Sequence, residues 1–154
     1  MSETDLDNSG SSVMRDDLIQ PFLLDESGIR GRLVRMGPAI DEILQRHDYP
    51  KVVNELLAEI LILTGVLSSL MKFSGCFTLQ SKSDGPIKML VSDMTSDGVL
   101  RGYAGVDDAA LKALLDKTED PSELTLTDLT GKGYIAFTVD QGANMERYQG
   151  IVEL

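Results

Sequence analysis

The sequence has few of the residues that disulfides, metal centres and nucleic-acid surfaces require. Its 154 residues include one cysteine, one histidine and no tryptophan, and 14 basic residues stand against 25 acidic ones, for a net charge of −11. One cysteine excludes an internal disulfide, and one cysteine with one histidine excludes a zinc cluster built by this chain alone. The negative charge argues against nucleic-acid and membrane partners. Because the acidic N-terminus also lacks the apolar segment of a signal peptide, we expect a cytoplasmic protein.

Composition predicts an acidic tail followed by a single folded domain. Residues 1–14 are polar, acidic and rich in serine, so they cannot bury enough apolar surface to offset the entropy lost on ordering. We therefore expect a disordered acidic tail over 1–14 and one domain over 15–154, a length that can bury a sizeable core. The sequence ends inside a strand pattern, which indicates a piece cut from a longer protein.

The longest apolar segment, Pro50–Lys72, is predicted to be a buried central helix. Pro50 suits the first helical turn, and Asp48 is expected to cap it. Glu55 and Glu59 shorten the apolar run below the ~20 residues that a membrane span needs, so we favour a core helix over a membrane span. The predicted apolar stripe has the helical spacing of three and four residues and consists of Val52, Leu56, Ile60, Leu63, Leu67 and Leu70.

Alternation of apolar and polar residues predicts strands on both sides of this helix. Turn signals such as Ser83–Pro86 and Ser96–Gly98 separate neighbouring strands, which favours antiparallel pairing. Short helices are expected over 39–46 and 107–118, and a polar connection over 119–130. The fold class is therefore α+β: a mostly antiparallel sheet packed around a long buried central helix, with additional short helices. The expected strands are 17–24, 29–36, 76–82, 87–94, 99–106, 133–140 and 147–154.

One face of the predicted sheet is more apolar than a solvent-exposed face should be. A face of this kind needs a cover, either another part of the parent protein or a bound partner. The apolar residues expected on this second face, and hence the candidate contact residues, are Leu90, Tyr134, Ala136 and Ile151.

Two groups could carry catalysis, and each also has a simpler structural interpretation. Cys76 could be a redox or nucleophilic thiol, but no second cysteine accompanies it and His47, which we expect at the surface, is distant in sequence. Glu55 and Glu59 lie one helical turn apart and could form an acid–base pair, or could simply line the solvated edge of the helix. We expect no catalytic residues, and we keep an enzyme as the less favoured alternative.

Two loops match ligand-binding patterns only in part. Gly131–Gly133 contains a lysine between glycines, but Tyr134 follows where a phosphate-binding loop has serine or threonine, so a tight turn is expected. The stretch 93–104 resembles a calcium loop, but its twelfth position is Ala104 in place of a bidentate glutamate. We therefore expect no metal site in this chain.

Several short segments occur in an order that is specific as a set, although each is weak alone. They are Ile29–Val34, Tyr49–Pro50, Leu56–Glu59, Lys72–Gln80, Asp84–Pro86, Arg101–Ala104, Gly131–Tyr134, Thr138–Asp140, Arg147–Val152 and Leu154. In this order they resemble the amino-terminal domain of the 33 kDa chaperonin family, also called heat-shock protein 33. The resemblance covers nearly all of the chain after the tail.

The resemblance implies an ATP-independent, redox-regulated holdase that binds unfolding proteins and prevents their aggregation under oxidative and heat stress. It also implies a homodimer. Residues 15–154 would be the client-binding and dimerisation domain, and unfolded or partly folded proteins would be its partners. The family's switch is a carboxy-terminal module with four cysteines on one zinc ion. Since this sequence lacks that module, zinc is expected in the missing domain of the parent and no cofactor in this chain. A purely structural dimerisation module is the alternative.

Overall fold

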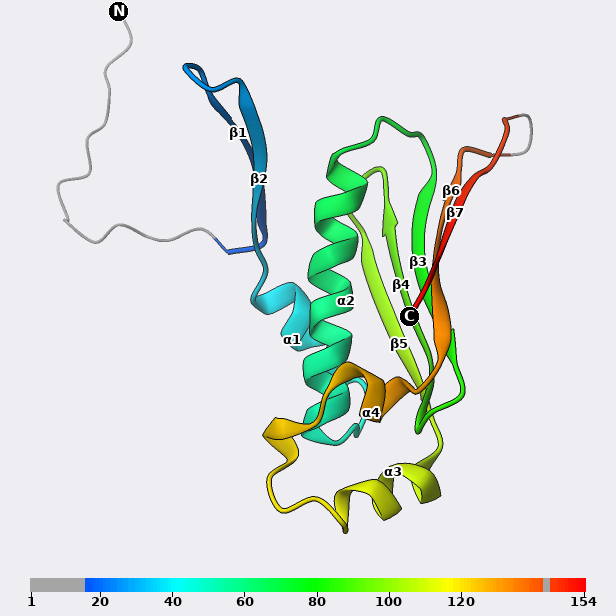
Figure 1. Ribbon diagram of the computed structural model, residues 1–154. Helices are drawn as coiled ribbons and strands as arrows, with labels where there is room; N and C mark the ends of the chain where they lie inside the picture. Colours follow the sequence, from blue (N-terminus) through cyan, green and yellow to red (C-terminus); the bar gives the residue numbers. More distant parts are fainter. Residues whose placement is uncertain (1–15, 143–144) are drawn as a thin grey trace, which may run out of the picture.

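The computed structural model describes residues 16–142 and 145–154 (Figure 1). The predicted tail over 1–14 lies outside the described residues. In chain order the elements are β1 (Leu18–Leu24), β2 (Ile29–Arg35), α1 (Pro38–Gln45), α2 (Lys51–Ser69), β3 (Cys76–Ser83), β4 (Ile87–Thr95), β5 (Leu100–Val106), α3 (Asp108–Leu115), the 3-10 turn η1 (Pro121–Glu123), α4 (Leu126–Thr130), β6 (Gly133–Asp140) and β7 (Tyr148–Glu153).

Five of the strands form one antiparallel sheet in the order β5-β4-β3-β6-β7, and β1 and β2 form a separate hairpin. Helix α2 lies along one face of the sheet, where it packs on β5, β4 and β3 (Figure 1). We call this face the inner face and the opposite one the outer face. The predicted α+β class and the central helix are confirmed, and the core lies between α2 and the inner face.

The inner face of α2 is rotated relative to the predicted stripe. Val53, Leu57 and Leu61 are fully buried, whereas Leu63 and Leu70 are 40% and 58% exposed. The predicted stripe is therefore correct at Val52, Leu56 and Ile60, which are buried, and wrong at Leu63 and Leu70. The helix is long and apolar enough to cross a membrane, with a mean hydropathy of 1.6. Its packing on the sheet identifies it instead as a core helix.

The N-termini of α2 and α4 differ from the sequence-based expectation. Pro50, not Asp48, occupies the N-cap position of α2, and no side chain caps this helix. Within the predicted polar connection, α4 begins with a capping box in which Thr125 and Asp128 each bind the other's backbone N–H. Leu129 of α4 is buried in the core, so this short helix closes the lower end of the inner layer.

The β1–β2 hairpin contacts the rest of the molecule mainly at its base. Ile19 and Met36 approach α2 at Gly65, where an added Cβ would lie 2.5 Å from the Met36 Cε. Such a two-stranded hairpin is marginally stable alone, so it depends on this contact with α2 or on a cover. Farther from the base, the hairpin exposes 46–57% of five large apolar residues: Phe22, Leu23, Leu24, Ile29 and Leu33.

A β-bulge in β4 reverses the predicted orientation of its residues. The register with β5 shifts between Ile87 and Met89, so both Ile87 and Leu90 face the core. Leu90 is 1% exposed. Its predicted place on the second face is therefore wrong, and Met89 and Val91 take that face instead.

The edge of the sheet at β5 is closed by a side chain from the connection between α1 and α2. The Tyr49 hydroxyl donates to the Ala104 carbonyl oxygen at 3.0 Å and accepts from the Ala104 N–H at 3.1 Å. These are outward backbone groups of β5, so Tyr49 prevents another strand from pairing there. His47 stacks on the Tyr49 ring with a centroid distance of 4.8 Å, which supports the closure.

Candidate functional site on the outer face of the sheet

The outer face carries an apolar row of side chains that crosses all five strands. Cross-strand pairing places its members side by side, since Tyr103 pairs with Val91, Val91 with Gln80, Gln80 with Ala136 and Ala136 with Ile151. Figure 1 shows α2 on the inner face and no described element over the outer face. The row therefore presents an uncovered, mostly apolar strip, interrupted by one glutamine. We call these five residues the apolar row.

The half of the apolar row on β6 and β7 lies in a hollow of about 750 Å³. Ile151 is 62% exposed and Tyr134 is 38% exposed, whereas Ala136 is only 9% exposed between its neighbours. An alanine flanked by larger side chains makes the floor of this hollow. The remaining lining residues are Gln80, Lys132, Gly133, Thr138, Gln149, Glu153 and Leu154.

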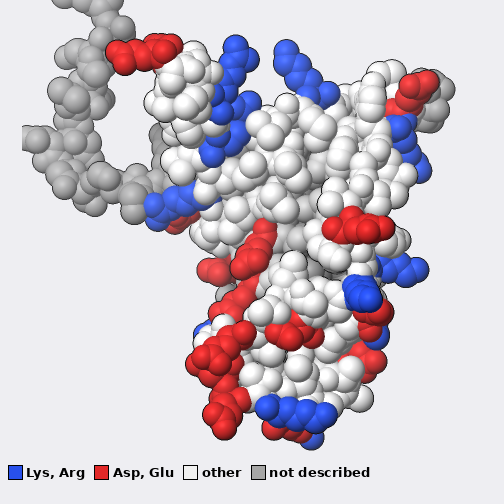
Figure 2. Space-filling model, in the orientation of Figure 1, with Lys and Arg blue, Asp and Glu red and all other residues white. Residues whose placement is uncertain are grey.

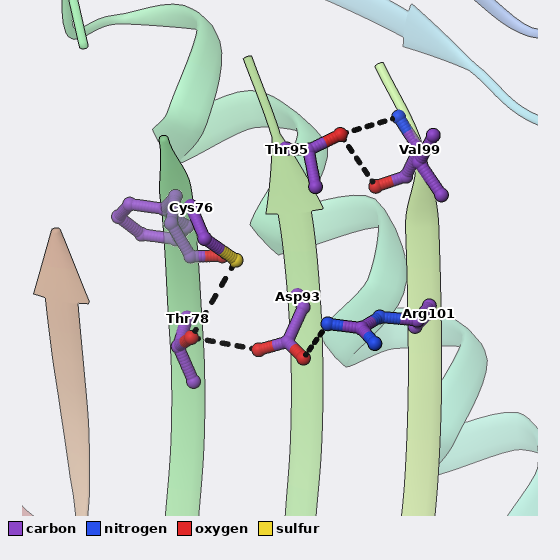
Figure 3. Close-up of polar contacts among 7 residues, drawn as sticks. Cys76, Thr78, Asp93, Thr95, Val99 and Arg101 are labelled. Carbon is purple, nitrogen blue, oxygen red and sulfur yellow. Dashed lines mark hydrogen bonds and ion pairs between the residues drawn. The ribbon is translucent and has the colours of Figure 1, made fainter. Parts of the chain in front are cut away.

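Beside the apolar row, the outer face carries a row of polar side chains that bind one another across the strands (Figure 3). The Thr78 hydroxyl donates to Asp93 Oδ1 at 2.7 Å, and Arg101 Nη2 donates to Asp93 Oδ2 at 3.1 Å. These contacts link β3, β4 and β5 on the outer face. The carboxylate of Asp93 is thereby balanced by a cation, so the polar row adds no unpaired charge beside the apolar row.

The two catalytic candidates do not assemble a reactive site. The Cys76 Sγ lies 4.0 Å from the Thr78 Oγ1 and 3.8 Å from the Phe77 carbonyl oxygen, as expected for a half-buried residue of a strand (Figure 3). His47 instead contacts the rings of Tyr49 and Tyr103, the latter at a centroid distance of 6.0 Å. The structure therefore does not bring Cys76 and His47 together.

Glu55 and Glu59 both line a groove of about 410 Å³ between α2 and the connection that holds η1 and α4. The Lys51 ammonium lies 3.6 Å from the Glu55 carboxylate, one helical turn away on the surface. The other lining side chains are aliphatic apart from Ser122. This arrangement fits the predicted helix edge beside a loop.

Gly131–Gly133 forms the expected turn into β6. Gly131 has a φ of 65°, which favours glycine, and the Lys132 N–H donates to Asp84 Oδ1 at 2.7 Å. The Gly85 N–H in turn donates to the Thr130 carbonyl oxygen at 2.7 Å. These bonds hold two turns together, and the backbone N–H of Lys132 is occupied by a carboxylate of the chain itself.

Three of the four predicted contact residues lie where the sequence analysis placed them. Tyr134, Ala136 and Ile151 line the same hollow on the outer face, whereas Leu90 is in the core. The structure also places Met89, Val91 and Tyr103 on the outer face, and the sequence analysis did not include them. Tyr103 could have been found from the alternation in its strand, but Met89 and Val91 could not, because the bulge is a feature of strand pairing.

The chain is similar to known proteins in both sequence and fold. The family model described as "Hsp33 protein" matches residues 17–154. A 33 kDa chaperonin of Caulobacter vibrioides is 40% identical over 139 residues, which cover 90% of this chain and 45% of the relative. A 33 kDa chaperonin of Escherichia coli is 34% identical over 138 residues, covering 90% and 44%. The crystal structure of the 33 kDa chaperonin from Thermotoga maritima aligns with a TM-score of 0.71 at 22% identity, over 88% of this chain and 45% of that one.

The matched proteins carry chaperone names, and one of them shares the fold, so the class of protein indicated is a chaperone. The chain belongs to the Hsp33 family, because the family model matches most of its length. The chain spans about half the length of the curated relatives it matches, 45% of the Caulobacter protein.

Proposed function

We propose that residues 15–154 are the client-binding domain of an ATP-independent holdase, which binds unfolding proteins and prevents their aggregation under oxidative and heat stress. The observation that carries this proposal is the uncovered apolar row with its hollow on β6 and β7. Unfolded proteins expose apolar segments without a fixed shape, and a broad strip can contact many of them. The Hsp33 membership supports the same function.

The hydrophobic effect supplies the affinity in this proposal. At about 25 cal/mol per Å², covering roughly 400 Å² of apolar surface contributes on the order of 10 kcal/mol before the costs of ordering and association. The net charge of −11 keeps the complex soluble. Figure 2 shows acidic side chains gathered over the lower part of the molecule, where Figure 1 places α3 and α4, with a few more at its upper end.

Redox regulation belongs, in our proposal, to the rest of the parent protein. One cysteine and one histidine cannot complete a four-ligand zinc site, so this chain does not fit the zinc that the family resemblance implies. We place the zinc and the redox switch outside these 154 residues, and the parent protein in the cytoplasm. The domain described here would then supply the client surface, and the absent part would control access to it.

Light scattering of a chemically unfolded, aggregation-prone protein tests the proposal. The wild-type chain should suppress scattering at stoichiometric excess, and Ile151→Asp should weaken this several-fold by placing a charge in the hollow. The matched control is Val99→Asp, which changes a residue of similar exposure, 52%, in the turn before β5. No suppression by the wild-type chain would contradict the proposal. Equal loss of suppression in both variants would show that the outer face is not the client-binding surface.

A second candidate function, a dimerisation module, is favoured by the exposed apolar residues of the β1–β2 hairpin. The homodimer implied by the family resemblance would bury Leu24, Ile29 and Leu33, which are each more than half exposed. Sedimentation should then detect a dimer in the wild-type chain, and Leu33→Glu should convert it to a monomer. A wild-type monomer at high concentration would remove this candidate and leave the client surface unaffected.

A further inference from the structure

Among the described residues, no strand pairs with the side of β7 that faces away from β6, and the backbone groups on this side can be assigned. The Leu154 N–H donates to the Gly133 carbonyl oxygen at 2.9 Å, which makes this a hydrogen-bonded pair. In antiparallel strands such pairs alternate with pairs that are not hydrogen-bonded. The backbone N–H and C=O groups of Gln149, Ile151 and Glu153 therefore point away from β6. Within residues 16–142 and 145–154, no hydrogen bond reaches these outward groups.

The hydrogen bonds on the other side of β6, which pair it with β3, support this assignment. The Asp84 N–H donates to the Lys132 carbonyl oxygen at 3.0 Å, so even-numbered residues of β6 bond to β3. Odd-numbered residues of β6 are then left to bond to β7, as the pair of Gly133 and Leu154 requires. The two observations agree, and they come from opposite sides of the same strand.

The β7 strand carries one charged residue, Glu153, but it lacks proline and a covering side chain from the described part of the chain, two features that usually protect a sheet edge. Protected edges carry proline, inward-pointing charges or a covering side chain. At the β5 edge, Tyr49 provides such a cover. The sequence of β7 contains no proline, and its large apolar residues are 60–70% exposed: Tyr148, Ile151 and Val152.

We propose that the β7 edge binds an extended segment of an unfolded client as an added sixth strand of the sheet. Such strand addition draws affinity from main-chain hydrogen bonds, which every sequence without proline can make, and specificity from alternate side-chain contacts. One face of the added strand continues the apolar row beside Ile151 and the hollow. The other face lies beside Tyr148 and Val152. This inference rests on the proposed holdase function and specifies how the client is bound.

The negative net charge of the chain favours a client segment with basic flanks over a second copy of the chain at this edge. A second copy of the chain would bring another −11 charges, and this repulsion opposes the pairing of two β7 edges. A client segment that is apolar and flanked by basic residues is attracted by the same field. An extended peptide with lysine flanks should therefore bind more tightly than the same peptide with glutamate flanks, and added salt should reduce the difference.

Substitution of Gln149 tests the edge in the full 154-residue chain. In Gln149→Pro, the ring removes an N–H that points away from β6, so the β6–β7 pairing keeps its hydrogen bonds while an outward donor is lost and the edge is obstructed. The matched control Gln149→Ala removes the same side chain and keeps the N–H. The probe is a fluorescent ten-residue peptide of alternating valine and threonine with lysine flanks. We expect about tenfold weaker binding to Gln149→Pro than to Gln149→Ala, from lost main-chain hydrogen bonds.

A modified peptide gives a test that needs no protein variant. N-methylation of its four central residues removes the backbone donors and keeps the side chains, so binding to the wild-type chain should fall by a similar factor. Equal binding of both peptides, or equal binding by both Gln149 variants, would overturn strand addition. If Ile151→Asp still lost suppression of aggregation in that case, the proposed function would stand without it. A wild-type dimer that only Gln149→Pro dissociates would also overturn the inference, because a second copy would then occupy the edge.

Discussion

The two ends of the five-stranded sheet are built for different purposes. At the β5 end, α2 covers the inner face and Tyr49 occupies the edge. At the β7 end, no helix packs closely on the inner face among the described residues, and the outward backbone groups are open. One end therefore supplies the stability of the domain. The other end has little of the packing that would hide its apolar side chains, which leaves them available to a partner.

Truncation in the core should give the largest difference between the two ends. Leu57→Ala removes a fully buried side chain of α2 and should lower the free energy of unfolding by about 2–5 kcal/mol. Val152→Ala, at a position 70% exposed on β7, should change it by less than about 0.5 kcal/mol. Urea denaturation measures both. Similar losses would mean that the β7 end is packed as firmly as the β5 end.

Two strand glycines test local side-chain contacts, which differ from the helix packing that distinguishes the two ends. An added Cβ at Gly150 of β7 would lie 2.2 Å from Phe137 Cε1, and this ring is already stacked on Phe77 at 6.1 Å. We expect Gly150→Ala to be destabilising by about 1–3 kcal/mol. At Gly105 of β5 the nearest atom would be 3.6 Å away, so Gly105→Ala should be neutral or slightly stabilising. The reverse order of the two thermal midpoints would contradict this description of the packing.

Removing one hydroxyl should make the β5 edge resemble the β7 edge. Tyr49→Phe leaves the outward groups of Ala104 without their partner, which should cost about 1 kcal/mol in unfolding free energy. The exposed edge should also increase self-association, measured by sedimentation at rising concentration. The control is Tyr134→Phe on the outer face, which should change neither quantity. Unchanged stability and association in Tyr49→Phe would show that the edge is protected by something other than this hydroxyl.

The smallest expected effect concerns the loop between β6 and β7. Hydrogen bonding from the Gly142 N–H at 3.0 Å, and then the charge of Arg147, hold the pKa of Asp140 below its ordinary value of 3.8. Because the folded-state pKa is the lower one, this contribution to stability is present above pH 3.8 and is lost as pH falls through the folded pKa. Carboxyl NMR titration should place the Asp140 midpoint below 3.8 and show that Arg147→Gln raises it.

Asp97 provides the control for that titration. Its pKa is lowered mainly by the Thr95 hydroxyl and not by a cation, so Arg147→Gln should leave its midpoint unchanged. Parallel shifts of both residues would indicate a general change in the charge of the protein. No shift at Asp140 would exclude Arg147 as a cause of its lowered pKa.

Most of the fold was predictable because helical and strand periodicities are local signals. The segments that became α2, β3 and β6 needed only the spacing of their apolar residues. The bulge at Ile87 and Met89 was not predictable in this way, since it arises from pairing with β5, and it moved Leu90 into the core. Helix α4 was missed although Thr125 and Asp128 have the spacing of a capping box.

The candidate site was predictable only in part. Tyr134, Ala136 and Ile151 follow from alternation, but the sequence does not say that β3 lies between β4 and β6. This strand order is what joins them to Val91 and Tyr103 in one row. The role of Tyr49 also depends on tertiary structure, because its hydroxyl binds a residue 55 positions away in the sequence.

Amide hydrogen exchange with and without a bound client peptide tests the central claim most directly. If the β7 end takes an extended segment as an added strand, the N–H groups of Gln149, Ile151 and Glu153 should become protected. Outward amides of β5, such as Gly102, should exchange at the same rate in both states. Unchanged exchange at Ile151 while the peptide is bound would contradict the account.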